Sequence, residues 1–324
     1  MTQRFLLFSL ALLAGSSALV AQTRTSEFEA VGERTIDRTT QTEDVRFRND
    51  GYDRMTVPVR LQGTGPYRFL VDTGADRTAI SRDLARKLNL RSGDDASLHT
   101  VGGMSSVQTA TVPALKLTRR DVRVVDAPLL ESSHMGADGI LGVDSLRSER
   151  VLFDFEGQTM SIVPSSSRDM AEERGSIVIK ATRRNGRLVL TQARANNRRV
   201  TVVLDTGAQI SIGNAALRKQ LLGTRPVDPS SLIELTSVTG EKIHGECVYI
   251  REVEIGGVKL NDLGVVFAHA HAFKKLGLDT RPAMLLGMNG LRAFKRISID
   301  FANKKFRVVL PEQSSRELRL AEAS

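Results

Sequence analysis

The amino-acid sequence predicts an all-β protein made of two similar lobes. Short apolar segments of alternating polarity are separated by turns rich in glycine and asparagine, such as residues 63–66, and this pattern is typical of strands. A unit with the same order of motifs occurs twice along the chain. The length of 324 residues is sufficient for two domains of roughly 100–150 residues each. A hydrophobic fraction of 41% is that of a globular chain, which excludes disorder throughout.

The first residues have the features of an export signal. Arg4 supplies a positive charge, and residues 5–14 form an apolar run that is too short to cross a membrane comfortably. Small residues follow, so cleavage after Ala18 or Ala21 is expected. The sequence therefore predicts a signal peptide and export, with the bacterial periplasm as the expected location. An uncleaved signal anchor is the alternative, and no stable membrane span is expected elsewhere.

Composition divides the rest of the chain. Residues 22–50 are polar and are expected to form a flexible N-terminal segment, with a removable pro-segment as the alternative. A polar linker separates two strand-rich regions, and a charged tail follows the second. The predicted domains after the signal peptide (1–21) are the N-terminal segment (22–50), the N-terminal lobe (51–164), the linker (165–175), the C-terminal lobe (176–311) and the tail (312–324).

One helix is expected within the first lobe, over residues 82–88. Leu84 and Leu88 fall on the same face of such a helix. Ser81 precedes it and is a suitable N-cap, because its hydroxyl can accept a hydrogen bond from a free N–H of the first turn.

An Asp-Thr-Gly-Ala motif is the centre of the internal repeat. It occurs at residues 72–75 and again at 205–208, in both cases directly after an apolar, strand-like run. Four other segments recur in the same order: 100–103 with 237–240, 122–127 with 263–268, 140–142 with 285–287, and 151–155 with 297–301. This agreement indicates two copies of one β-rich unit.

A duplicated aspartate has a specific chemical use. A peptide bond can be cleaved when one carboxylate activates a water molecule and a second, protonated carboxyl donates to the carbonyl oxygen. Two carboxyls close together cannot both ionise easily, so their pKa values separate and one stays protonated. Asp72 and Asp205, one from each lobe, fit this requirement.

The remaining motif residues have supporting roles. Gly74 and Gly207 permit a tight turn after each strand. The hydroxyls of Thr73 and Thr206 can form hydrogen bonds to the opposite lobe and hold the two loops together.

Each motif ends in alanine where a serine hydroxyl could have stabilised the charged carboxylate. Because Ala75 and Ala208 cannot donate such a bond, we hypothesise that the aspartates titrate at higher pH than in serine-containing relatives. Thr78 and Ser211, six residues after each aspartate, extend the local hydroxyl pattern.

On these motifs the sequence resembles the pepsin and retropepsin superfamily of aspartic proteases, and more narrowly the bacterial exported retropepsin-like proteins with two lobes in one chain. The resemblance covers roughly residues 55–310. It implies a two-lobed aspartic protease fold of duplicated β-barrels with a cleft between them. It also implies that Asp72 and Asp205 are the catalytic dyad.

The resemblance further implies two kinds of accessory segment. An apolar-apolar-Gly motif is expected behind each active-site loop, at Ile140, Leu141 and Gly142 and at Leu285, Leu286 and Gly287. Substrate-binding flaps are expected at Val101, Gly102, Gly103 and Met104 and at Val238, Thr239 and Gly240. One flap or two remains open, although neither tip has the tyrosine of pepsins, which favours the retropepsin arrangement.

The predicted function is that of an aspartic endopeptidase acting on an extended peptide or protein substrate, without metal or other cofactor. A catalytically silent peptide-binding module of the same fold is the alternative. A monomer is expected because one chain supplies both aspartates. The net charge of +9 comes from dispersed arginines without interleaved aromatic residues, so no nucleic-acid binding is expected.

Other chemically capable residues are interpreted as structural. Cys247 is the single cysteine and is expected to act as a small buried hydrophobe. His269 and His271 would share a strand face, without a third ligand nearby. Two histidines, His99 and His134, could approach the cleft but appear isolated. Asp76 and Asp138 are each present in only one lobe. Asp154 and Asp300 recur in both lobes and are expected in turns.

Overall fold

The computed structural model describes residues 55–116, 121–147, 149–165 and 176–311, together with the backbone of five short strands before residue 55. Those strands are β1 (Phe5–Leu7), β2 (Leu13–Ala14), β3 (Phe28–Glu29), β4 (Glu43–Arg46) and β5 (Arg48–Asn49). Apart from the backbone of these strands, the predicted signal peptide and N-terminal segment lie outside the described residues, as do most of the linker and the tail. Strands account for 53% and helices for 14%, which confirms a mostly β protein.

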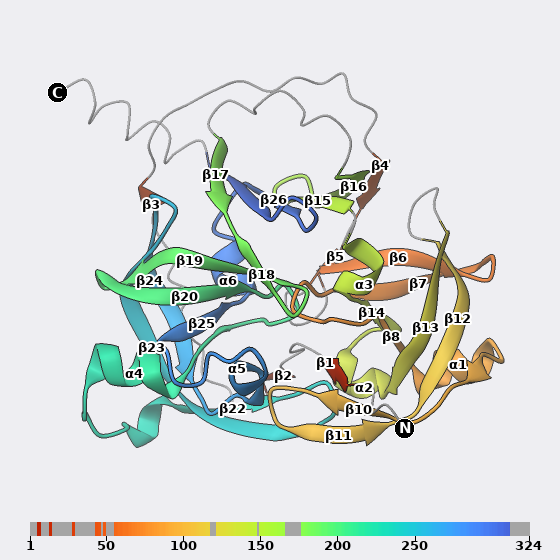
Figure 1. Ribbon diagram of the computed structural model, residues 1–324, viewed down its shortest axis with the longest axis horizontal. Helices are drawn as coiled ribbons and strands as arrows, with labels where there is room; N and C mark the ends of the chain where they lie inside the picture. The colour runs from red at the N-terminus through yellow and green to blue at the C-terminus, as the bar shows by residue number, and fades with distance from the viewer. Residues whose placement is uncertain are drawn as a thin grey trace.

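The N-terminal lobe contains a closed six-stranded barrel (Figure 1). Its strands are neighbours in the order β6 (Met55–Leu61), β7 (Thr64–Val71), β14 (Gly139–Leu141), β8 (Ala79–Ser81), β13 (Asp121–Leu130) and β12 (Thr109–Lys116), and pairing of β12 with β6 closes the ring. β9 (Arg91–Ser92) adds to β12 and β5 adds to β6. In β6 the buried Val57, Val59 and Leu61 alternate with exposed residues, as expected of a strand with one face in the core.

The C-terminal lobe repeats this arrangement. Its ring consists of β19 (Arg187–Ala195), β20 (Arg198–Leu204), β25 (Ala283–Leu286), β21 (Ser211–Gly213), β24 (Val258–Phe267) and β23 (Lys242–Ile255), closed by β19 with β23. β18 (Thr182–Arg184) and β22 (Leu232–Thr236) extend it. Strands with matching sequence motifs occupy matching places, because β7 pairs with β14 in parallel just as β20 pairs with β25.

A six-stranded sheet joins the lobes at the top of Figure 1. Its order is β17 (Ser176–Lys180), β27 (Lys305–Val309), β26 (Arg296–Asp300), β15 (Glu149–Asp154), β16 (Thr159–Pro164) and β4. At its centre β15 of one lobe pairs with β26 of the other, with Val151 opposite Ile299 and Phe153 opposite Ile297. These are the last repeated segments of the sequence, so the duplicated units meet through equivalent strands.

Each lobe carries one hairpin that reaches toward the other, at the bottom of Figure 1. In the N-terminal lobe, β10 (Ala96–His99) pairs with β11 (Met104–Val107). In the C-terminal lobe, β22 pairs with the first residues of β23. The structure therefore has two flap-like hairpins, which decides the question that the sequence left open.

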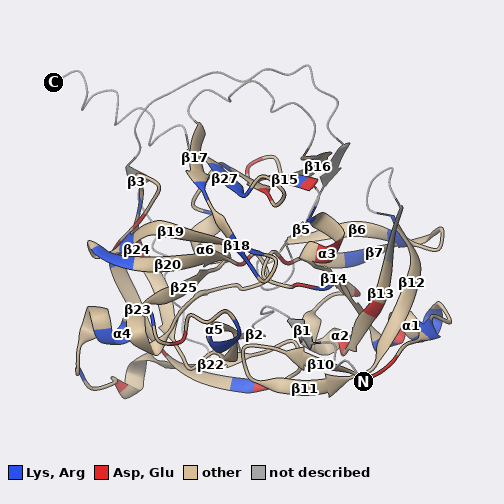
Figure 2. Ribbon diagram, in the orientation of Figure 1, with Lys and Arg blue, Asp and Glu red and all other residues tan. Residues whose placement is uncertain are grey.

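The helices are short. α1 (Arg82–Lys87) begins after Ser81, whose hydroxyl accepts a hydrogen bond of 3.1 Å from the Leu84 N–H, and Leu88 is its C-cap, so the predicted helix is confirmed. The others are α2 (Ser132–Met135), α3 (Val143–Leu146), α4 (Ala215–Leu222), η1 (Pro229–Ser231), α5 (His271–Lys275) and α6 (Met288–Leu291). Across the described part of the chain, none is long and apolar enough to cross a bilayer. Figure 2 shows the lysines and arginines dispersed over both lobes.

Candidate active site

The two Asp-Thr-Gly-Ala loops begin where β7 and β20 end. The Asp72 N–H donates to the Leu141 carbonyl and the Asp205 N–H donates to the Leu286 carbonyl, both at 3.0 Å. Leu141 and Leu286 are the last residues of β14 and β25, so the apolar-apolar-Gly motifs lie directly behind the aspartate loops. Each aspartate is thereby fixed at the end of a buried parallel strand pair.

The threonines of the two motifs exchange hydrogen bonds between lobes. The Thr73 N–H donates to Thr206 Oγ1 at 3.0 Å, and the Thr206 N–H donates to Thr73 Oγ1 at 3.1 Å. Each hydroxyl then donates to the strand of the other lobe, from Thr73 to the Leu204 carbonyl at 3.2 Å and from Thr206 to the Val71 carbonyl at 2.7 Å. These are the cross-lobe bonds expected from the sequence, and they hold the two loops in a symmetric arrangement.

Both aspartate carboxyls are held by their own turns. Asp72 Oδ1 accepts the N–H groups of Gly74 (2.8 Å) and Ala75 (3.0 Å), and Asp205 Oδ1 accepts those of the equivalent Gly207 (3.1 Å) and Ala208 (3.2 Å). A Cβ on Gly207 would lie 2.3 Å from Asp72 Cγ, so only glycine leaves room for the carboxyl of the opposite lobe. The repeated motif thus brings the two carboxyls together.

The electrostatics of the carboxyl pair favour protonation. Burial raises the pKa of Asp205 to about 7, although the charge of Arg187 acts in the opposite direction. Burial and then the charge of Asp205 raise the pKa of Asp72 well above its usual value. Two adjacent carboxyls with raised pKa values hold at least one proton between them near neutral pH. Burial is the main cause of these raised pKa values. A further increase caused by alanine in place of serine at positions 75 and 208 stays a prediction.

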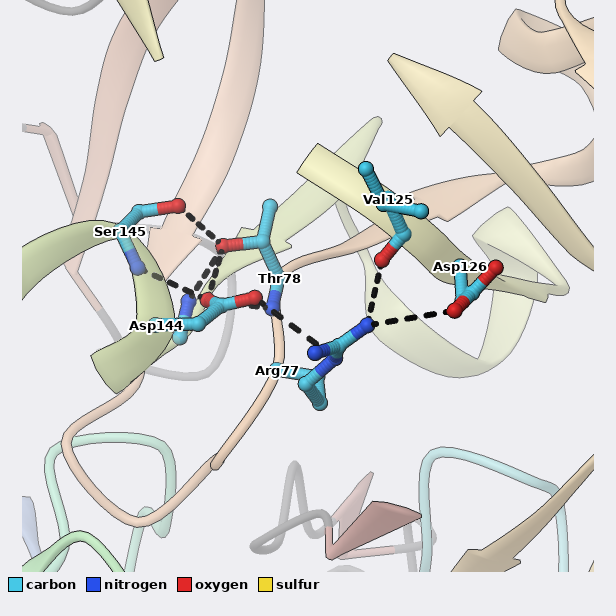
Figure 3. A network of polar contacts seen from close by, with 7 residues as sticks. Arg77, Thr78, Val125, Asp126, Asp144 and Ser145 are labelled. Carbon is cyan, nitrogen blue, oxygen red and sulfur yellow. Dashed lines mark hydrogen bonds and ion pairs between the residues drawn. The ribbon is translucent and has the colours of Figure 1, made fainter. Parts of the chain in front are cut away.

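A polar network supports the loop after Asp72 (Figure 3). The N–H and hydroxyl of Thr78 both donate to Asp144 Oδ1 at 2.8 Å. Arg77 lies 3.8 Å from Asp144 Oδ2 and 4.0 Å from Asp126 Oδ2, and it also donates to the Val125 carbonyl. The network fixes the loop to α3 on one side and to β13 on the other.

The second lobe repeats the first part of this network with a neutral acceptor. The N–H and hydroxyl of Ser211 donate to Asn289 Oδ1 at 2.9 and 2.8 Å. The hydroxyls of Thr78 and Ser211 also accept the N–H groups of Gly142 (3.1 Å) and Gly287 (3.0 Å). Sequence reasoning missed the acceptors Asp144 and Asn289, although each stands two residues after the glycine of a repeated motif.

The flap tips pack into the lobes opposite their own. Val101 is completely buried in the apolar cluster of the C-terminal lobe, beside Val203 and Ala208. Val238 is completely buried in the cluster of the N-terminal lobe, with Leu70 and Ala75. Each tip thus shares an apolar cluster with the alanine of one aspartate loop, and the exposed fractions of the aspartates are 1% for Asp72 and 0% for Asp205.

Glu241 joins the two flaps. Its carboxylate accepts hydroxyl hydrogen bonds from Thr100 and Ser105 of the first flap, both at 2.7 Å. It also accepts hydroxyl hydrogen bonds from Thr239 (2.8 Å) and Ser237 (3.2 Å) of its own hairpin. Nothing in the spacing of the sequence indicated that Glu241 joins the flaps, because Thr100 and Ser105 lie more than a hundred residues earlier.

The histidine interpretations need correction. His99 Nδ1 lies 3.0 Å from His271 Nε2, so His99 is not isolated. His271 begins α5 and does not share a strand face with His269. His134 lies against the second flap, since a Cβ on Gly240 would be 2.5 Å from its ring. Within the described ranges, no group of three or more acidic, histidine or cysteine residues has the geometry of a metal site.

Four carboxyl groups other than those of Asp72 and Asp205 have structural partners. Asp154 Oδ1 accepts the N–H of Gly157 (2.7 Å) and Asp300 Oδ1 that of Asn303 (2.9 Å), which confirms their turn roles. The other two are present in only one lobe: Asp138 Oδ2 accepts the Arg68 N–H at 2.8 Å, and Asp76 pairs with the buried Arg187 of the other lobe at 3.3 Å. Sequence reasoning missed this last pair.

Cys247 is partly buried against the apolar cluster of the C-terminal lobe. Burial raises the pKa of its thiol, which suits a packing role better than that of a nucleophile.

Two family models match the chain, one in each lobe. A model described as gag-polyprotein putative aspartyl protease matches residues 57–148, and a model described as aspartyl protease matches residues 191–289. No curated protein matches the chain significantly. Each match contains one Asp-Thr-Gly-Ala loop and one apolar-apolar-Gly motif, and together they cover more than half of the sequence. The chain therefore belongs to the retropepsin-like aspartyl proteases and carries two such domains in tandem.

Proposed function

We propose that this protein is an aspartic endopeptidase whose catalytic dyad is Asp72 and Asp205. The observation that carries the proposal is the pair of buried carboxyls, one from each lobe, aligned by reciprocal threonine hydrogen bonds. Both aspartates are retained in matching loops, whereas a protein that only binds peptides has no use for two adjacent carboxyls with raised pKa values.

The mechanism follows from the shared proton. The ionised carboxyl removes a proton from water as that water attacks the peptide carbonyl, and the protonated carboxyl donates to the carbonyl oxygen. The N–H groups of Gly74 and Gly207 keep the inner oxygens in place through the reaction. The carboxyl that took the water proton then donates it to the leaving amine as the C–N bond breaks, and a hydroxyl of the tetrahedral intermediate returns its proton to the other carboxyl, which regenerates a singly protonated pair.

Substrate entry requires the flaps to move. The carboxyls are fully covered when Val101 and Val238 occupy the opposite lobes, so both tips must withdraw before a peptide reaches the dyad. An extended peptide or protein segment then fits between the flap hairpins and the aspartate loops, where strand-like pairing gives affinity. One chain supplies both halves of the site, which supports action as a monomer.

A peptide library incubated from pH 3 to 8 tests the proposal. Wild type is expected to cut it, and a statine-type transition-state mimic is expected to block the cuts. Asp72→Asn and Asp205→Asn should abolish cleavage while remaining folded. Absence of cleavage by folded wild type at every pH would contradict the proposal, and saturable binding of uncut peptides in that case would favour the silent peptide-binding module.

We also propose export to the periplasm, on the signal-like features of residues 1–21. Amino-terminal sequencing of protein recovered from cell fractions tests it. A periplasmic product that begins after Ala18 or Ala21 would support cleavage. An intact start at Met1 in the membrane fraction would indicate an anchor.

A further inference from the structure

Arg187 occupies an unusual position for an arginine. It is the first residue of β19, and its side chain is only 1% exposed. The hairpin turn before it explains this placement. Asn185 and Gly186 have φ values of 47° and 85°, as a two-residue type I′ turn requires, and Arg184 pairs with Arg187 across it. The guanidinium thereby leaves its own lobe and reaches the loop that carries Asp72.

The contacts of Arg187 lead to the Asp72 carboxyl. Its Nε donates to the Gly74 carbonyl, and its Nη1 lies 3.3 Å from Asp76 Oδ1. The Gly74 carbonyl belongs to the same peptide group as the Ala75 N–H, which donates to Asp72 Oδ1 at 3.0 Å. Hydrogen bonds in series polarise one another inside a protein, so the guanidinium strengthens the bond that Asp72 receives.

Arg187 also acts on both aspartates through its charge. Burial raises the pKa of each carboxyl, and the charge of Arg187 lowers the pKa of both. Asp76 faces the guanidinium. Burial raises the pKa of Asp76 to about 6, although the charge of Arg187 lowers it. Asp144 and Arg77 are the other charged groups that act on Asp76. A nearby cation favours the single ionisation of a buried carboxyl pair, because opposite charge stabilises the charged form.

The lobes differ at this point. Gln209 in the C-terminal lobe stands where the N-terminal lobe has Asp76, so the carboxylate partner of the guanidinium exists on one side only. The asymmetry distinguishes Asp72 from Asp205 in a site that is otherwise nearly symmetric.

We propose that Arg187 is a positioning residue for the dyad. Its guanidinium fixes the Gly74–Ala75 peptide against Asp72 and keeps one carboxyl of the pair ionised. The Gly74 contact holds the guanidinium in place, and Asp76 offsets part of its charge. This inference rests on the proposed peptidase function for its catalytic meaning, but its electrostatic content can be measured without substrate.

Two variants with opposite expected effects test it. Arg187→Met removes the cation, so both limbs of the pH profile of kcat/KM should move to higher pH, by about one unit or more. Asp76→Asn removes the offsetting anion while the contact with Gly74 remains, so both limbs should move to lower pH. Arg187→Lys keeps the charge and should leave the limbs close to wild type, with kcat reduced because an ammonium cannot reproduce the Nε contact.

Carbon-13 NMR titration of the Asp72 and Asp205 carboxyls, without substrate, gives an independent readout. The carboxyl titrations should move to higher pH in Arg187→Met and to lower pH in Asp76→Asn. If they do while no protein cuts any peptide, the peptidase function fails and the electrostatic role of Arg187 stands.

Shifts in one direction for both Arg187→Met and Asp76→Asn, or unchanged titrations in folded variants, would overturn the proposal. Near-ultraviolet circular dichroism establishes folding. If Arg187→Met does not fold, Arg187→Gln removes the charge while keeping a hydrogen-bond donor toward the Gly74 carbonyl, and its titrations should also move to higher pH.

Discussion

At the scale of single residues, the site is built by close approach of groups from opposite lobes. The Asp72 carboxyl occupies the space where a side chain on Gly207 would lie, and the Thr73 and Thr206 hydroxyls each serve as acceptor and donor for the other lobe. Each of these residues therefore acts on the lobe that it does not belong to. Variants that add or remove one methyl or hydroxyl group can separate the effect of these residues on activity from their effect on stability.

Gly207→Ala is expected to disrupt the carboxyl pair. The new methyl group would lie 2.3 Å from Asp72 Cγ, so the carboxyl must shift, and activity should fall by a factor of about 100 or more. Gly264→Ala is a matched control, because its Cβ would meet nothing closer than 3.5 Å. Peptidase rates of the two folded variants check this. Equal rates would show that the dyad does not need the space at Gly207.

Thr206→Val is expected to lower the free energy of unfolding by about 1–3 kcal/mol. The change keeps the shape but leaves the buried Thr73 N–H and Val71 carbonyl without this partner. Thr206→Ser retains the hydroxyl and should recover most of the loss. Urea denaturation of both variants measures the difference. A Val variant as stable as wild type would mean that the exchanged bonds align the loops without stabilising the fold.

At the scale of elements, the two flap hairpins form a closed cover held by one carboxylate. Burial works against ionisation of Glu241, yet hydrogen bonds from Thr100 and three other hydroxyls hold its pKa below the usual value. The charged form is therefore the one that fastens the flaps. The first flap tip is also held to α5 of the C-terminal lobe by the backbone bond from the His271 N–H to the Val101 carbonyl at 2.8 Å.

Glu241→Gln is expected to loosen both flap tips. An amide replaces one acceptor oxygen with a donor, so hydroxyl bonds from the opposite flap are lost. Amide hydrogen exchange at residues 100–103 and 237–241 should become faster. Glu234→Gln, on the same hairpin, removes a carboxylate that pairs with Lys242 at 2.9 Å away from the flap contact, and should leave those rates unchanged. Equal exchange in both variants would contradict the role of Glu241.

At the scale of the whole molecule, the shared sheet and the closed flaps bury ionisable groups between the lobes. Strands β15 and β26 connect the lobes on the side away from the flaps, so the two aspartate loops meet inside one body (Figure 1). Burial of Asp72, Asp76 and Asp205 raises the pKa of each. Global stability must therefore depend on pH.

The free energy of unfolding is expected to decrease as pH rises from about 4 to 7. Groups with pKa values raised by folding bind more protons in the folded state, so their contribution is complete below pH 4. It is lost as pH passes the folded values of about 6 for Asp76 and about 7 for Asp205. Chemical denaturation at several pH values measures this, and Asp205→Asn should weaken the dependence. A pH-independent stability over that range would show that these carboxyls are ionised in the folded protein.

Much of the fold could be predicted because it is encoded locally and twice. The alternation in β6, the N-cap of α1 and the repeated motifs each require only neighbouring residues, and the duplication supplied an internal check. The residues that cross between lobes could not be predicted in the same way. Asp76 and Arg187 are far apart in sequence, as are Glu241 and Thr100 or His99 and His271, and no local periodicity links them.

By itself, the sequence determined that the chain is a duplicated β protein with one aspartate loop in each half, because strand patterning and turn chemistry act over a few residues. Only the tertiary structure decided that the flaps are two, that their tips exchange lobes, and that the buried Arg187 of one lobe reaches the Asp72 loop of the other. Those features depend on how the two halves are placed against each other. That placement is fixed by long-range pairing in the shared sheet and by packing between the lobes, which short stretches of sequence do not contain.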